Sequence, residues 1–282
     1  MVKFIAYVNG RLIPEDRAVI SILDRGFTLA DGLFETMTAI NENVRYLDRH
    51  LDRLVHGCGV MGFELPPRSD VIAILEETLK ANQFSLSTIR ITVSRGYDYK
   101  RGLPVHEKLV PSIIVRVAER VNSFGGEVSL MISDVRRNEG SPLSNLKTLA
   151  YADSVFARKV ANGLGYDDAL MLNNKNRVVC ATSSNFFLVR DGLILTPPLS
   201  DGALPGIVRS LILCENFSGG INICEKSITP DFNNVDAAFI TNVVTGVTNV
   251  SHIDGRFIGS DEGLKIVGQL ADRYHDDTLD QP

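Results

Sequence analysis

Residues 144–151 read SNLKTLAY and place one lysine, Lys147, just before a predicted helix. The helix is expected from Leu149 to Asn162, because apolar residues recur there at helical spacing and Gly163 follows. A lysine in this position is usually a solvated charge. It becomes a nucleophile only where burial lowers its pKa and a partner makes covalent attachment useful. Lys147 is therefore a candidate catalytic residue that needs support from other segments.

Two further stretches have the local pattern of an anion site. Residues 203–209 read ALPGIVR, so that proline and glycine open a predicted helix whose first N–H groups have no partner within the helix. Residues 241–246 read TNVVTG and end an apolar strand, where more N–H donors are expected. Each stretch is also an ordinary turn when taken alone. Together with Lys147 they favour a phosphate-bearing ligand.

Composition limits the classes of partner. The chain has 282 residues, a formal charge of -5 and 44% hydrophobic content, which fits one large domain or two modest ones. Its basic residues are scattered, which argues against nucleic acid, and no apolar run reaches membrane-spanning length. The start of the chain lacks a signal peptide pattern, and four cysteines lack metal-ligand spacing. We expect a cytoplasmic protein with reduced thiols and a small-molecule partner.

The pattern along the chain predicts two α/β domains, at residues 1–120 and 121–282. Asn9-Gly10 predicts an opening β-hairpin, and helices are expected after Asp48 and after Pro66-Pro67. The polar stretch 119–126 is the expected linker. Beyond it, residues 149–162 predict a helix whose packing face is Ala152, Val155, Phe156 and Val160.

The second half alternates short strands and turns. Strands are expected at 128–133, 169–172, 178–180, 186–189, 193–195 and 237–244. Hairpin turns are expected at 173–174, 191–192 and 254–255. A short helix near residues 264–270 and a disordered polar tail from Asp276 complete the prediction.

Five segments in a fixed order resemble the fold type IV pyridoxal phosphate enzymes, which include branched-chain and D-amino acid aminotransferases and aminodeoxychorismate lyase. The segments are 23–36 (LDRG through DGLFET), 50–54 (HLDRL), 144–151, 183–187 (SSNFF) and 203–209. The resemblance covers nearly the whole chain. It implies the two-domain α/β (α+β) architecture of that fold, pyridoxal 5'-phosphate as cofactor and a homodimer.

The resemblance also assigns roles to residues. It implies that Lys147 forms the Schiff base with the cofactor and that Arg53 binds the cofactor phosphate. The backbone of Ile207 and Val208 is similar to the helix start that holds the same phosphate. The side chains similar to those that contact the cofactor ring and its phenolic oxygen are Leu204 and Tyr151.

Three positions depart from the family pattern. Cys180 stands where the family places a glutamate that keeps the pyridine nitrogen protonated. In the second phosphate loop Val243 replaces a hydroxyl residue, which leaves Asn242 and backbone donors, while Val244 is expected to contact substrate. Phe34, also expected at the substrate, replaces the tyrosine of D-amino acid aminotransferases.

Substrate carboxylate is expected to meet the loop residues Arg95, Lys100 and Arg101, although three charges in a polar loop are more often solvated. The favoured function is a class IV aminotransferase that acts on a small amino acid or amine through Lys147. Chain length and the Phe34 position lower the expectation for branched-chain enzymes. The alternatives are a pyruvate-releasing aminodeoxychorismate lyase and a cofactor-binding homologue in which Cys180 leaves little or no catalysis.

Overall fold

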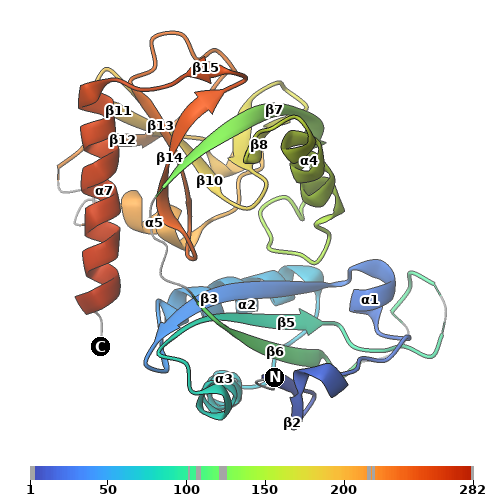
Figure 1. Ribbon diagram of the computed structural model, residues 1–282. Coiled ribbons are helices and arrows are strands. Elements are labelled where there is room, and N and C mark those ends of the chain that lie inside the picture. The colour runs from blue at the N-terminus through green and yellow to red at the C-terminus, as the bar shows by residue number, and fades with distance from the viewer. Residues whose placement is uncertain are drawn as a thin grey trace. The chain divides into compact units, whose positions relative to one another are not determined.

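The computed structural model describes residues 4–100, 102–105, 109–120, 126–214, 217 and 220–280. The chain forms two compact units. Unit 1 spans Met1–Asn122 with Lys147–Ala150, and unit 2 spans Ser123–Leu146 with Tyr151–Pro282 (Figure 1). Most of the expected linker, at residues 121–125, lies outside the described residues. None of the described helices is long and apolar enough to cross a membrane.

Unit 1 begins with the predicted hairpin. Strands β1 (Ile5–Val8) and β2 (Arg11–Pro14) pair antiparallel, and Val8 lies opposite Arg11. The two turn residues Asn9 and Gly10 both have positive φ, at 46° and 90°. Asparagine and glycine accept this conformation at least cost, which confirms the turn prediction.

The sheet of unit 1 has six strands in the order β2-β1-β6-β5-β3-β4, and all of its neighbours are antiparallel. Its other strands are β3 (Gly32–Ile40), β4 (Asn43–Val44), β5 (Leu86–Ser94) and β6 (Ser112–Glu119). Strand β4 pairs only with Ala39 and Ile40, so the first half of β3 is left as an edge. This edge receives the segment that carries Lys147.

Helices α2 (Leu47–Met61) and α3 (Arg68–Asn82) lie where the sequence predicts them. Helix α2 packs on β3, and α3 packs on β1 and β6 (Figure 1). The buried side chains of α2 include Leu51, Leu54 and Cys58, which follow helical spacing. A short helix α1 (Arg25–Leu29) precedes β3 and is capped by the Asp24 side chain.

Residues 147–150 join unit 1 although the sequence assigns Lys147 to the second domain. Phe34 N–H donates to the Lys147 carbonyl at 3.0 Å, and Leu149 N–H donates to the Gly32 carbonyl at 3.0 Å. Leu149 therefore lies before the helix, which begins at Ala152, and is not helical as predicted. A side chain at Gly32 would meet the Val93 carbonyl oxygen at 2.4 Å and Leu149 Cδ1 at 2.9 Å, so glycine permits this close approach.

Unit 2 is built on a mixed nine-stranded sheet. Its strands are β7 (Glu127–Arg137), β8 (Asp168–Asn173), β9 (Val178–Ala181), β10 (Asn185–Arg190), β11 (Leu193–Thr196), β12 (Ile223–Glu225), β13 (Ala237–Asn242), β14 (Gly246–Ile253) and β15 (Arg256–Phe257). The order is β12-β11-β10-β13-β14-β7-β8-β9, and β15 pairs with β14. Cys180 on β9 also pairs with Asn185 on β10. That pairing closes six of the strands into a ring around the core.

The core of unit 2 is apolar and confirms the predicted strands. Phe186, Leu188, Leu170 and Leu130 are fully buried in one cluster. The predicted turn at 191–192 is confirmed, since Asp191 and Gly192 have φ of 51° and 71° between β10 and β11. The turn at 173–174 is longer than predicted, because β9 begins only at Val178.

Helix α4 (Ala152–Gly163) packs on β7 and β8 through a different face from the predicted one. The buried side chains are Ser154, Ala157 and Ala161, whereas Phe156 is 59% exposed. The predicted face is therefore wrong. Small residues let the helix approach the sheet closely, and the larger apolar side chains point outward.

The final helix is also longer than predicted. Helix α7 runs over Asp261–Asp280, past the expected end at residue 270 and into the expected polar tail. Val267, Leu270 and Tyr274 are buried at helical spacing, and α7 packs on β13 and β14 (Figure 1). The apolar stripe therefore continues through the polar stretch, which explains why the short-helix prediction is wrong.

Candidate functional site

Lys147 lies at the edge of β3 with its amine over an aromatic ring. Its Nζ is 4.2 Å from the centroid of the Phe34 ring, and the Arg90 guanidinium carbon is 3.7 Å from the same centroid. Burial lowers the pKa of Lys147 to about 8; Glu35 opposes this shift, while Arg53 and Arg90 add to it. A lysine of lowered pKa offers a neutral, nucleophilic amine near neutral pH.

Glu35 is the centre of a buried polar cluster in unit 1. Its Oε1 accepts from Arg53 Nε at 2.8 Å, and its Oε2 accepts from Arg53 Nη2 at 2.7 Å and bonds His50 Nδ1 at 2.8 Å. Burial opposes ionisation, but the hydrogen bonds from Arg53 and His50 outweigh it and lower the pKa of Glu35 to about 2. Glu35 is thus an anion at every physiological pH.

His50 is a neutral member of this cluster. Burial lowers the pKa of His50 and outweighs the opposing effect of Glu35. The neutral ring then donates its Nδ1–H to the Glu35 carboxylate. Its Nε2 is buried and accepts no hydrogen bond from any described residue.

Arg53 is held inside unit 1 and is not a solvated surface charge. Its side chain is 12% exposed and binds the Glu35 carboxylate through two nitrogens. The bidentate pair fixes the plane of the guanidinium. The expectation that Arg53 binds the cofactor phosphate stays a prediction.

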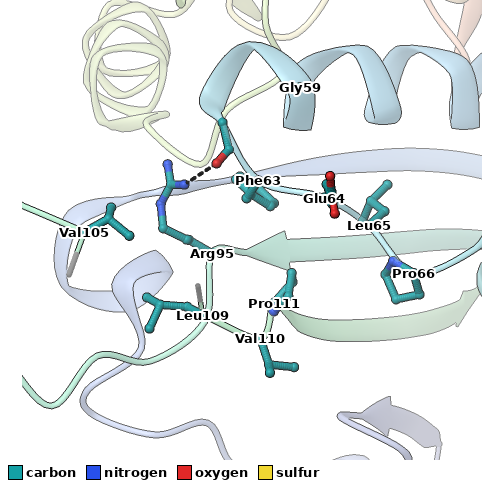
Figure 2. Close-up of a pocket in the computed structure, with 11 residues that line it drawn as sticks. Gly59, Phe63, Glu64, Leu65, Pro66, Arg95, Val105, Leu109, Val110 and Pro111 are labelled. Atoms are coloured by element: carbon teal, nitrogen blue, oxygen red, sulfur yellow. Dashed lines mark hydrogen bonds between the residues drawn. The ribbon is translucent and has the colours of Figure 1, made fainter. Parts of the chain in front are cut away.

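The side chain of Arg95 is held by hydrogen bonds to other residues of unit 1. Its Nε and Nη2 donate to the Asp31 carboxylate at 2.8 and 3.1 Å, Nη2 also donates to the Met61 carbonyl, and Nη1 donates to the Gly62 carbonyl. Figure 2 shows the last bond and the cavity of about 820 Å³ that Arg95 lines with Phe63. The described lining of that cavity does not include Lys147. These contacts favour a structural role, so Arg95 as a carboxylate-binding residue stays an unsupported prediction.

Of the other two basic loop residues, the structure describes Lys100. Lys100 is exposed, and its backbone N–H donates to the Asp98 side chain at 2.9 Å. Arg101 lies outside the described residues. The substrate role predicted for each of them stays a prediction.

In unit 2, helix α5 (Ile207–Ile212) begins where the sequence predicts, and no side chain caps it. Gly206 precedes it, and a Cβ there would lie 1.9 Å from Asn185 Oδ1. Asn185 Nδ2 donates to the Leu204 carbonyl at 2.8 Å, which fixes the turn. Ile207 and Val208 are buried, and an uncapped helix start of this kind fits an anion.

The loop after β13 is organised by Asn242. Its Oδ1 accepts from Val244 N–H at 2.8 Å and from Thr245 N–H at 2.9 Å, and its Nδ2 donates to Ser184 Oγ. Two of the backbone donors that the sequence offers to a ligand are thus already engaged. Tyr274 of α7 donates to the Val243 carbonyl at 3.2 Å and holds the same loop from the other end of the chain.

Cys180 lies in β9, opposite Met171 and Asn185. Burial raises the pKa of its thiol, with a smaller opposing effect from Arg137, so the side chain stays a neutral thiol. Tyr151 precedes α4, and its carbonyl accepts from Val155 N–H at 2.9 Å. Contact of Cys180 and Tyr151 with the cofactor stays a prediction.

Sequence reasoning missed three residues of the Lys147 surroundings. Glu35 and His50 lie in segments that carry the resemblance, but no role was assigned to them. Arg90 sits in β5 between the buried residues Ile89 and Ile91. A charged residue inside an alternating strand was the available signal, because it marks the side chain that faces away from the core.

Known proteins resemble the chain over nearly its whole length. The amino-transferase class IV family matches residues 32–253. A putative branched-chain-amino-acid aminotransferase of Methanocaldococcus jannaschii is 31% identical over 274 residues, which cover 96% of this chain and 95% of that protein.

Two solved structures extend this likeness. The branched-chain aminotransferase of Thermoproteus uzoniensis, solved with norvaline, has a TM-score of 0.85 and 26% identity over 97% of each chain. A putative 4-amino-4-deoxychorismate lyase of Legionella pneumophila has a TM-score of 0.82 and 26% identity, covering 92% of this chain and 97% of that one.

We expect Lys147→Met to stabilise the cofactor-free protein at pH 7. The folded pKa of about 8 lies below the ordinary 10.5, so between these values the unfolded chain binds a proton that the folded chain lacks. Wild-type stability should rise with pH across that window, and the variant should lose the rise. The difference at pH 7 is at most about 3 kcal/mol, reduced by residual exposure of the side chain.

Urea unfolding at pH values from 7 to 11 measures this difference. Lys159→Met, at an exposed position of α4, is the control and should follow the wild type. Parallel pH curves for wild type and Lys147→Met would contradict a lowered pKa at Lys147.

Proposed function

Since the chain belongs to the class IV aminotransferases, we propose that it transfers the amino group of a small apolar amino acid to a 2-keto acid, with Lys147 as the residue that binds the cofactor covalently. The cofactor of this enzyme family is pyridoxal 5'-phosphate. The observation that carries the proposal is the Lys147 amine of lowered pKa beside Arg53 and Glu35. Bound cofactor supplies an aldehyde carbon for amine exchange and a ring that delocalises negative charge.

The residues present fit such a group. Attachment needs an unprotonated amine, and at pH 7 a pKa of about 8 leaves roughly 10% of Lys147 neutral, against about 0.03% at the ordinary value. The largely buried guanidinium of Arg53 is an anion partner of fixed orientation. The role expected for the backbone of Ile207 and Val208 in unit 2 stays a prediction.

Lys147 also has the properties of a proton carrier. Catalytic acids and bases work best with a pKa near the operating pH. Lys147 Nζ would accept a proton from the substrate α-carbon and return it to the reacting group, so the same atom serves as base and then as acid. The Phe34 ring covers one side of this nitrogen.

Arg90 is our candidate for the residue that binds the second carboxylate of a dicarboxylic keto acid. Its guanidinium and the Lys147 amine lie over the same Phe34 ring, which places a cation within reach of the reacting nitrogen. Its Nε donates to Thr92 Oγ1 at 3.2 Å, which orients the group. We propose for Arg90 a role of the kind that the loop pattern predicts for Arg95, whose own role stays a prediction.

The names of the relatives favour transamination of an apolar amino acid, which runs against the expectation that the chain is not of the branched-chain type. The likeness to a lyase structure at equal identity, 26%, supports pyruvate release as a second candidate. Assays of leucine or norvaline with 2-oxoglutarate, and of aminodeoxychorismate for pyruvate release, decide between them. Activity only in the second assay would favour the lyase.

We propose a homodimer, because unit 1 exposes large apolar side chains on two segments that are tied together. Ile22 and Phe27 are 78% and 67% exposed, and Leu103 is exposed beside them. Arg25 donates to the carbonyls of Gly102 and Leu103 and so joins the segments. Monomeric proteins rarely leave such patches uncovered, and a second copy is the occupant we propose. Cytoplasmic location stays a prediction.

Borohydride reduction should fix a phosphopyridoxyl group on Lys147. Reduction converts the carbon–nitrogen double bond at that amine into a stable single bond, so peptide mass spectrometry should find the added mass on the peptide that contains residue 147. Lys159→Met should be labelled like the wild type, whereas Lys147→Met should not be labelled. Label on a different lysine would refute the assignment.

Arg90→Met should raise the KM for 2-oxoglutarate about tenfold or more, because loss of a charged hydrogen bond weakens binding by about 1.5–3 kcal/mol. The KM for a monocarboxylic 2-keto acid should change little. The matched control is Arg116→Met, since Arg116 lies opposite Arg90 on the neighbouring strand and binds Glu15. Equal effects on both keto acids would exclude Arg90 as the carboxylate partner.

The wild type should have the mass of two chains by light scattering. Phe27→Asp should shift it toward one chain, because a charge in a buried apolar interface is costly. Phe257→Asp, on β15 in unit 2, also places a charge at an exposed aromatic position and should leave the mass unchanged. A wild-type mass of one chain would contradict the proposal.

A further inference from the structure

Three basic side chains lie around neighbouring residues of β3: Lys147 and Arg90 lie over the Phe34 ring, and Arg53 binds Glu35. The charged groups that act on the Lys147 amine are Glu35 from β3, Arg53 from α2 and Arg90 from β5. We infer that Glu35 is a positioning residue that offsets these cations and thereby sets the protonation of Lys147, in addition to holding Arg53. This inference rests on the proposed role of Lys147.

The geometry gives Glu35 a fixed place for this role. Adjacent strand residues point to opposite faces, so Phe34 and Glu35 lie on the two faces of β3. The Lys147 segment pairs with β3 at the edge that β4 leaves open. A side chain at the edge of a sheet can reach either face. The amine therefore lies over the Phe34 ring on one face and within the field of the Glu35 carboxylate from the other.

The partners of Glu35 keep it charged and fix its position. Arg53 binds both carboxylate oxygens, at 2.8 and 2.7 Å, and His50 adds a third bond at 2.8 Å. His50 contributes no charge of its own, because burial keeps its ring neutral. The acid thus neutralises Arg53, and its removal would leave Lys147 facing two unopposed guanidinium groups.

Lys147 must be neutral to attack and protonated to return a proton, so its pKa has to stay near the working pH. Burial and two arginines all push the pKa down. Glu35 is the described side chain that pushes it up. Without Glu35 the amine would be neutral over a wider pH range, but it would be a weaker base and less often protonated at the working pH.

The test is Glu35→Gln, which removes the charge and keeps the shape. Acetic anhydride labelling of the cofactor-free full chain over pH 5–10, read on the Lys147 peptide, gives the midpoint of its titration. We expect the midpoint to be near pH 8 in the wild type and lower by about one unit or more in the variant, since one opposite charge shifts a neighbouring pKa by about 1–3 units. Labelling at pH 6 should then be about tenfold faster.

Asp31→Asn is the matched control. Asp31 is another largely buried acid of unit 1 that binds two arginines, Arg25 and Arg95. Its loss should disturb the fold to a similar extent but leave the Lys147 midpoint unchanged. An equal shift in both variants, or none in folded Glu35→Gln, would overturn the inference and leave Glu35 as a structural anchor of α2.

Arg90→Met provides a second test in case Glu35→Gln does not fold. It removes an exposed cation, so the same account requires the Lys147 midpoint to rise. An unchanged midpoint would overturn the inference. Acetic anhydride labelling needs no cofactor, so its outcome does not depend on borohydride trapping. Failure of borohydride trapping would reject the proposed function and leave the inference about Glu35 standing.

Discussion

The hydrogen bond from Phe34 N–H to the Lys147 carbonyl, at 3.0 Å, is the contact on which the site in unit 1 depends. With an isolated antiparallel bridge between Leu33 and Thr148, it ties the Lys147 segment to the edge of β3. Backbone pairing of this kind defines a position within a fraction of an ångström, whereas a long lysine side chain alone would sample many rotamers. Strand β3 then carries both the ring that covers the amine and the acid that acts on its charge.

Burial of a charged cluster is expensive, and this explains why Glu35 has three hydrogen bonds. Removing one partner of a buried ion pair typically destabilises a protein by about 3–5 kcal/mol, whereas replacing the whole pair by apolar groups is often neutral. Stability alone therefore gives little reason for Glu35, Arg53 and His50 to be buried together. The effect that we propose for Glu35 on the Lys147 amine gives such a reason.

Local patterns predicted the elements whose signals are local. The Asn9-Gly10 turn, helices α2 and α3 and the core strands of unit 2 follow from turn chemistry and periodicity. Prediction was wrong where packing decided, as on α4, where small residues face the sheet. It also ended α7 too early, because the polar residues around Asp276 hide the continuing stripe through Tyr274.

The site shows the same division. Resemblance pointed to Lys147 and Arg53, whose positions at the β3 edge and on α2 are now described, while their roles toward the cofactor stay predictions. No role was predicted for Glu35, because β3 is buried on both faces and its sequence gives no alternating pattern of apolar and polar residues. The substrate role expected for Arg95 stays a prediction, and its surroundings could not be read from the sequence, since the partners of an arginine in a fold are often distant in sequence. Asp31, Met61 and Gly62 bind Arg95, and only the fold brings them together.

Unit 1 is discontinuous in the chain, because Lys147–Ala150 returns to it after the chain has begun unit 2. A single cut after residue 122 would separate Glu35 of β3 and Arg53 of α2 from Lys147. Neither unit can therefore be exchanged between genes as one continuous segment without dividing unit 1. A recombination point that preserves the site has to lie beyond residue 150, within the sequence of the second unit.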